Sequence, residues 1–145
     1  MEHTKEKQNE MLFDYDFKEW TKNNLRKDRY TITDVDAIIR DTTDDGTNRI
    51  MLVELKRFYS EPRENQCISY RILHALITKG IDACNGEIEI KICGKNQMTR
   101  VEYLGTHLLQ LSNATFDESE FKFDRKDVDL STLIETLNFN NQTST

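Results

Sequence analysis

Hydrophobic and polar residues follow different periods along this chain, and the changes of period mark the elements that we expect. Apolar residues recur at helical spacing from Met11 to about Leu25, which predicts a first helix. Segments 30–41 and 49–59 are rich in β-branched residues and predict strands, the first in one piece or two. The polar stretch TTDDGTN between them predicts a hairpin turn with Gly46 in the left-handed conformation.

A second helix is expected after the second strand. Ser60 suits its N-cap, Pro62 is tolerated in a first turn, and Lys79–Gly80 provides a glycine stop. The apolar stripe of this helix consists of Ile68, Ile72, Leu73, Ala75 and Leu76.

The last third of the chain predicts two strands and a short helix. Residues 86–94 alternate isoleucine with charged residues, as in a half-exposed strand, and residues 99–105 predict another. His107 then falls in an expected loop. Residues 127–137 predict a terminal helix with an apolar face, which carries Leu130, Leu133, Ile134 and Leu137.

Together these elements predict the α/β fold class, with a central mixed β-sheet flanked by helices. A length of 145 residues suits one domain, 1–145, with a core of its own. We expect the core over about 11–104 and flexible polar tails at 1–9 and 138–145.

The charge of the chain is unevenly distributed. The net charge of −6 argues mildly against a nucleic-acid partner. However, residues 49–79 carry six bases against three acids, whereas residues 101–145 carry eight acids against three bases. A net-acidic protein of this kind can still present a locally basic groove.

The sequence favours an intracellular, cytoplasmic protein without a membrane partner. No apolar run approaches the roughly 18 residues needed to span a bilayer, and the polar N-terminus has no signal region. Cys67, Cys84 and Cys93 have no metal-binding or CxxC spacing, so we expect plain buried or half-buried thiols.

Carboxylates inside the first two predicted strands are the main candidates for chemistry. Asp34 and Asp36 share one strand face, and Glu54 and Lys56 share one face of the next strand. A hairpin centred on Asp45 pairs residues whose numbers sum to 90, which puts Asp36 opposite Glu54 with Cβ atoms roughly 5 Å apart. Because like charges at that distance repel, we expect a divalent cation between them, Mg²⁺ or Mn²⁺.

An Asp on one strand and Glu-x-Lys on the next, here VDAII and VELK, resembles the PD-(D/E)XK nuclease superfamily. Over residues 12–93 the order of elements is also similar. The resemblance implies a restriction-endonuclease-like core of α-β-β-β-α-β order, with Asp36 and Glu54 as metal ligands and Lys56 as the catalytic lysine. The Pro of the family motif is absent, and the gap between Asp36 and Glu54 is long, which the hairpin accounts for.

Further residues match parts of the family pattern. The family often has an acid on its first helix, and Glu19 is the better match and Glu10 the weaker. Asp34 is a second candidate ligand or a hydrogen-bonding neighbour of the metal. QCISY resembles the Gln-x-x-x-Tyr motif of the RecB-like, Holliday-junction-resolvase-like branch, which implies that Gln66 and Tyr70 support the lysine or contact the substrate backbone.

The expected function is therefore that of a Mg²⁺- or Mn²⁺-dependent nuclease that hydrolyses phosphodiester bonds of nucleic acid, with DNA as the expected substrate. A homodimer is plausible for a nuclease of this size. The alternative is a catalytically inactive binding or scaffold protein on the same fold. In simpler interpretations Asp36, Glu54 and Lys56 form an ion network on a solvated sheet face and Glu19 is a surface acid.

Overall fold

The computed structural model describes residues 19–25, 35–116 and 119–139. Two compact units, Met1–Ile32 and Thr33–Thr145, make up the chain. In the first unit, residues 19–24 form helix within the range predicted for one, and the other residues of that prediction lie outside the described part. The second unit contains β1 (Ala37–Thr42), β2 (Asn48–Arg57), α2 (Glu64–Cys84), β3 (Glu87–Ile92), β4 (Lys95–Leu111), β5 (Phe121–Phe123), β6 (Lys126–Val128) and α3 (Leu130–Leu137).

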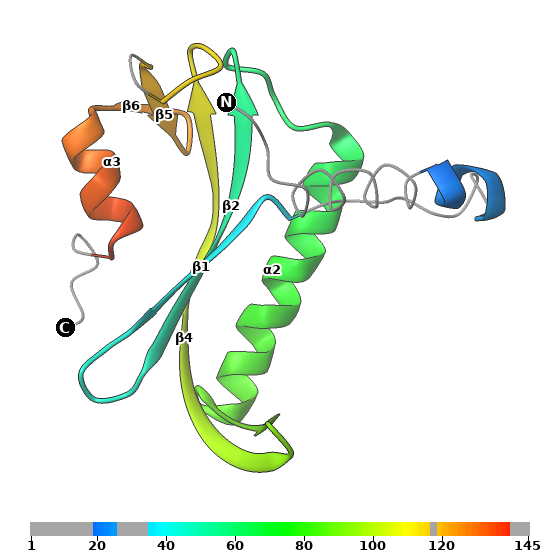
Figure 1. Ribbon diagram of the computed structural model, residues 1–145, viewed down its shortest axis with the longest axis vertical. Helices are drawn as coiled ribbons and strands as arrows, with labels where there is room; N and C mark the ends of the chain where they lie inside the picture. The colour runs from blue at the N-terminus through cyan, green and yellow to red at the C-terminus, as the bar shows by residue number, and fades with distance from the viewer. Residues whose placement is uncertain (1–18, 26–34, 117–118, 140–145) are drawn as a thin grey trace, which may run out of the picture. The chain divides into compact units, whose positions relative to one another are not determined.

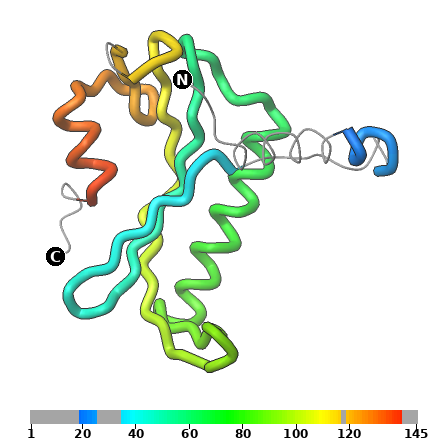
Figure 2. Tube along the Cα trace, viewed as in Figure 1, coloured from blue at the N-terminus to red at the C-terminus, as the bar shows by residue number. Residues whose placement is uncertain are grey.

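The second unit is built on a mixed β-sheet with helices against it (Figure 1). The strand order is β1-β2-β4-β5-β6, and β3 forms a hairpin with the first part of β4. β1 is antiparallel to β2, whereas β2 and β4 are parallel, so α2 lies in the crossover that parallel neighbours require (Figure 2). This arrangement confirms the expected α/β class with a mixed sheet. None of the described helices is both long and apolar enough to cross a membrane.

The β1–β2 hairpin has the predicted register. Ala37 pairs with Val53 and Thr42 with Asn48, so paired numbers sum to 90. Gly46 has a φ of +86°, as the turn prediction requires. The Thr43 N–H donates to the Thr47 carbonyl at 2.9 Å, which closes a loop of three residues.

Helix α2 differs from its prediction at both ends. Its N-cap is Arg63, not Ser60, and the Gln66 side chain closes the first turn by accepting the Arg63 N–H at 3.0 Å. The helix continues through Gly80 and ends at Asn85 and Gly86, which both have positive φ. One glycine costs a helix only about 1 kcal/mol, whereas two consecutive left-handed residues cannot continue it.

The apolar stripe predicted for α2 does not lie against the sheet. Ile68, Ile72 and Leu76 are 48%, 57% and 64% exposed, whereas Tyr70 is buried. Periodicity predicts an amphipathic helix correctly but cannot distinguish its two sides when both carry apolar residues. The side with the tyrosine packs inward because the facing strand offers its hydroxyl group a buried partner.

Strand β4 is much longer than residues 99–105. It passes Gly105, where a bulge shifts its register with β2, and includes His107, which the sequence analysis assigned to a loop. Gly105 has a φ of +95°, so the glycine that suggested the end of a strand instead forms its bulge. The three-residue strands β5 and β6 were not predicted.

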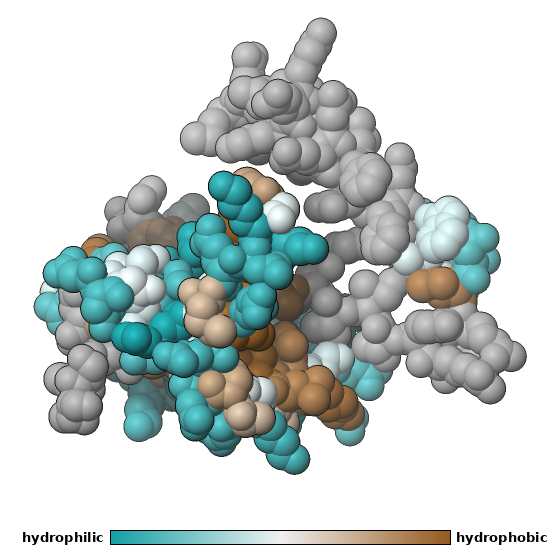
Figure 3. Space-filling model, turned by 90° about the horizontal axis from the view of Figure 1, so that it is seen from below, coloured by the Kyte–Doolittle hydropathy of each residue, from teal (hydrophilic) through white to brown (hydrophobic). Residues whose placement is uncertain are grey.

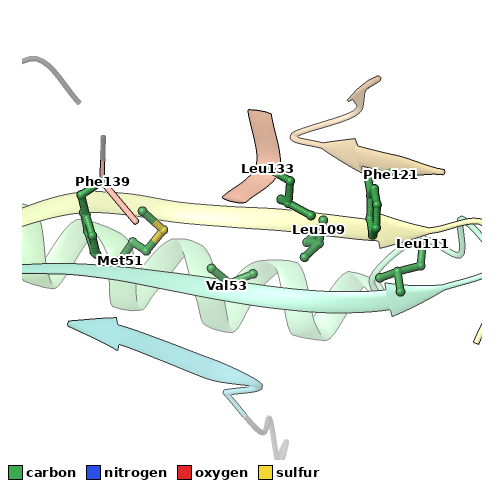
Figure 4. Packing of buried hydrophobic residues seen from close by; sticks show 7 residues of the cluster. All are labelled: Met51, Val53, Leu109, Leu111, Phe121, Leu133 and Phe139. Carbon is green, nitrogen blue, oxygen red and sulfur yellow. The ribbon is translucent and has the colours of Figure 1, made fainter. Parts of the chain in front are cut away.

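The hydrophobic core lies between the sheet and α3 (Figure 4). It extends well beyond residue 104, and Phe139, which falls in the expected tail, is only 3% exposed. On α3, Leu133 is buried while Leu130 and Ile134 are half exposed, so the inner face is narrower than predicted. The buried cluster consists of Met51, Val53, Leu109, Leu111, Phe121, Leu133 and Phe139.

Candidate active site

A pair of carboxylates lies where β1 begins beside β2. Asp36 immediately precedes β1, and the hairpin register extended by one residue brings it opposite Glu54. The Asp36 Oδ2 accepts the backbone N–H of Leu55 at 2.7 Å, which holds this carboxylate against β2. Glu54 is only 5% exposed. Burial raises the pKa of Glu54, and the nearby negative charge of Asp36 raises it further.

Tyr70 of α2 lies against this carboxylate pair. Its hydroxyl group donates a hydrogen bond to Glu54 Oε2. Burial raises the pKa of Tyr70 and the bond to Glu54 adds to the effect, so the phenol remains a proton donor. The donated bond in turn favours the charged form of Glu54 and opposes the effect of burial.

Lys56 connects the carboxylates to the start of α2. Its Nζ lies 3.4 Å from Glu54 Oε1 and donates to Gln66 Oε1 at 3.0 Å. The same Gln66 oxygen accepts the Arg63 N–H that closes the first helical turn. The ammonium group is therefore positioned jointly by a strand neighbour and by a helix cap.

The structure brings five of the predicted site residues into one network: Asp36, Glu54, Lys56, Gln66 and Tyr70. Burial of Glu54 argues against the simpler interpretation as ion pairs on a solvated face. Glu19 belongs to the other unit, where it lies 3.6 Å from Lys22. Asp34 and Glu10 lie outside the described residues.

A pocket of about 180 Å³ opens beside Glu54 and Tyr70, and the sequence analysis did not predict it. Two arginines from different elements line it, Arg71 on α2 and Arg125 between β5 and β6. Arg125 also forms an ion pair with Glu61 at 2.9 Å. The pocket thus combines a buried carboxylate with two cationic side chains.

His107 and Asp124 also line this pocket. His107 Nδ1 lies 2.7 Å from Asp124 Oδ2, and its Nε2 lies 2.6 Å from the Leu104 carbonyl oxygen. Burial lowers the pKa of His107, but these two acceptors outweigh burial and raise the pKa above its ordinary 6.5. With both nitrogens engaged, the ring braces the β4 bulge and is not free to serve as a base.

Gln110 is a further buried polar residue on the α2 side of the sheet. It pairs with Lys56 across β2 and β4 and is 2% exposed. Its Nε2 donates to the Ser60 carbonyl at 3.1 Å and so ties down the segment that leads into α2. Its Oε1 is buried without a hydrogen-bond partner among the described residues. Sequence alone gave no signal for Gln110, because β4 was not predicted to reach this far.

Comparisons with known proteins find no relative for this chain. No family model, no curated protein and no solved structure matches it. The functional argument therefore depends on the chemistry and geometry of the site.

Proposed function

We propose that this protein is a metal-dependent nuclease of the PD-(D/E)XK type, which hydrolyses phosphodiester bonds in nucleic acid, with DNA as the expected substrate. One observation carries the proposal. The exposed Asp36 and the buried Glu54 converge with Lys56 at the α2 side of the sheet, where Gln66 holds Lys56 and Tyr70 holds Glu54. A buried carboxylate such as Glu54, beside the second carboxylate of Asp36, is costly unless it binds something. The mixed sheet with flanking helices is compatible with a restriction-endonuclease-like core.

The donor set suits Mg²⁺ or Mn²⁺. Asp36 and Glu54 provide hard oxygen ligands. Burial first, and the negative charge of Asp36 second, raise the pKa of Glu54, and a bound cation would offset both effects. No group of three or more His, Cys, Asp or Glu side chains converges in the part of the chain that the structure describes. Two protein carboxylates suit Mg²⁺, which commonly keeps several waters and takes ligands from substrate phosphate. When bound, the ion would supply Lewis-acid chemistry by lowering the pKa of a coordinated water.

Each of the other residues then has a defined task. Lys56 donates a hydrogen bond to the attacking water and offsets negative charge that develops on the phosphate. Gln66 restricts the Lys56 ammonium group to the side of the site. Tyr70 keeps Glu54 oriented by donating to one of its oxygens, which leaves the other toward Lys56.

The neighbouring pocket supports a nucleic-acid substrate despite the net charge of −6. Arg71 and Arg125 approach it from two elements, within reach of a chain that passes Glu54. Guanidinium groups bind phosphate oxygens through paired hydrogen bonds, so these two side chains suit backbone phosphates on one side of the scissile bond. Both contacts would be independent of base sequence.

The proposal is tested by cleavage assays on circular and linear duplex DNA, single-stranded DNA and RNA, each with Mg²⁺, Mn²⁺, Ca²⁺ or EDTA. Lys56→Ala is compared with Lys79→Ala, which removes an exposed lysine of the same helix-and-sheet unit away from the site. We expect wild-type cleavage with Mg²⁺ or Mn²⁺, none in EDTA, and a loss of at least about a hundredfold in Lys56→Ala only.

Titration calorimetry with Mn²⁺ separates the two functional hypotheses. Binding by the wild type that is lost in Glu54→Gln, together with cleavage, supports the nuclease. Absence of both cleavage and metal binding would overturn it and leave the inactive binding or scaffold protein as the better description.

A further inference from the structure

β3 presents an open sheet edge at the end of the unit remote from Glu54. No other described strand but β4 pairs with it, and all six of its residues are exposed. One face carries Ile88, Ile90 and Ile92, which are 48%, 37% and 42% exposed. In the space-filling view from this end, hydrophobic residues gather in a patch with hydrophilic ones around it (Figure 3). Open edges with apolar side chains are templates for pairing with another strand.

Alternate residues of β3 direct their backbone N–H and C=O groups away from β4. The two-residue turn of Cys93 and Gly94 makes Ile92 and Lys95 a hydrogen-bonded pair, and Val101 N–H donates to the Gly86 carbonyl at 2.7 Å. In an antiparallel ladder such pairs alternate, so the isoleucines bond to β4. The N–H and C=O groups of the charged residues between them therefore point to the open edge.

We propose that β3 pairs antiparallel with β3 of a second copy of this chain, around a two-fold axis at Ile90. In this register Glu89 lies opposite Lys91 of the partner subunit, and Ile88 lies opposite Ile92 of the partner subunit. The two strands would join the two sheets into one. An isologous contact of this kind requires a self-complementary sequence, and EIEIKI satisfies that requirement.

Charge distinguishes this register from its neighbours. An axis at Glu89 would put glutamate against glutamate, and an axis at Lys91 would put lysine against lysine. A shift by a single residue would put isoleucine on the same face as charge. Among axes within β3, only the axis at Ile90 pairs opposite charges without also pairing like charges, and it keeps isoleucine opposite isoleucine, so a second copy complements this edge.

The apolar side of the paired strands would continue into an existing hollow. A pocket of about 260 Å³ lies between the end of α2 and β4, and Ile88 forms part of its wall. The remaining lining consists of Ile77, Ile81 and Val101 together with Gly80, Cys84 and Gly86. Pairing would cover the isoleucine row that now extends this pocket into solvent. The inference does not depend on the proposed nuclease activity.

The test uses charge reversal on the full chain, followed by analytical ultracentrifugation. Within the subunit Glu89 pairs with Met98 and Lys91 with Asn96, so neither reversal creates a charge clash in the β3–β4 hairpin. Glu89→Lys puts lysine against lysine at two places across the axis, and Lys91→Glu puts glutamate against glutamate. We expect each single variant to dimerise at least about tenfold more weakly than the wild type.

Restored dimerisation in combined variants would identify the proposed charge pairs specifically. An equimolar mixture of the two single variants should form a heterodimer, and the double variant Glu89→Lys/Lys91→Glu should dimerise like the wild type. Unchanged melting temperatures would show that the subunit fold is intact. A monomeric wild type, single variants that dimerise normally, or a mixture without rescue would each overturn the proposal, whatever the cleavage assays show.

Discussion

The two faces of the central sheet are built from alternate residues of the same strands, yet one face buries an apolar cluster and the other also buries polar side chains. Val53 and Leu109 point into an apolar cluster closed by α3. Their neighbours Glu54 and Gln110 are just as deeply buried but lie on the face toward α2, where both form hydrogen bonds beside the buried Leu52 and Leu108. The apolar face that carries Val53 and Leu109 can stabilise a fold by itself, because it removes apolar surface from water.

The polar face must therefore be explained by something other than stability. Burying a carboxylate costs free energy, and an apolar replacement of similar size is often neutral or stabilising. The network of Tyr70, Lys56 and Gln66 offsets that cost without removing it. The contrast indicates that the apolar cluster on the α3 side stabilises the fold, whereas the polar network on the α2 side holds side chains in a binding-ready arrangement.

The largest loss of stability is expected when a side chain of the apolar face is truncated. Leu111 is 1% exposed, so Leu111→Ala should lower the free energy of unfolding by about 2–5 kcal/mol, through lost burial and the cavity left behind. Urea denaturation measures the change, with Leu130→Ala, at a half-exposed position, as the matched control. Mn²⁺ binding by the folded variant should remain, and a combined loss of binding would break the division between the faces.

An intermediate effect is expected from the polar face. Tyr70→Phe removes the hydroxyl group that donates to Glu54 Oε2 and should lower the free energy of unfolding by about 1–3 kcal/mol, since a buried acceptor loses this partner. Tyr59→Phe is the control, because its hydroxyl group meets Glu120 at the surface at 3.4 Å. Equal stability losses in the two variants, measured by urea denaturation, would contradict the role given to Tyr70.

The smallest effect concerns pH and is measured in EDTA. Burial raises the pKa of Glu54 above 4.5, so the folded state favours the protonated acid. Its contribution to stability is complete below pH 4.5 and is lost as pH rises through the raised value. Glu54→Gln cannot titrate, so its stability relative to the wild type should increase across that window. A difference that stays constant with pH would show that Glu54 is not perturbed in the folded protein.

The hairpin and the site network could be predicted because they depend on short-range rules. A loop centred on Asp45 fixes which residues of β1 and β2 lie opposite each other, and strand alternation puts Glu54 and Lys56 on one face. The four-residue spacing of Gln66 and Tyr70 likewise fixes their common side of α2.

The remaining features depend on contacts between distant segments. Asp124 meets His107 only because β5 returns alongside β4, and nothing near either residue encodes that pairing. Periodicity could not predict which side of α2 packs inward, because apolar residues occur on both sides and the choice is made by Tyr70 meeting Glu54. The predicted end of α2 was wrong, since Gly80 was chosen over the Asn85–Gly86 pair.

The bulge at Gly105 changes whether odd- or even-numbered residues of β4 face α2. Before the bulge, the odd-numbered Tyr103 points toward α2 and contacts His74. After the bulge, the even-numbered Gln110 lies on that side of the sheet and donates to the Ser60 carbonyl. One extra residue thus decides which residues of LLQL (108–111) face the α2 side of the sheet and which face the apolar cluster. Loss of that residue would reverse the two faces: Leu109 and Leu111 would point toward the carboxylates, and Gln110 would point into the apolar cluster.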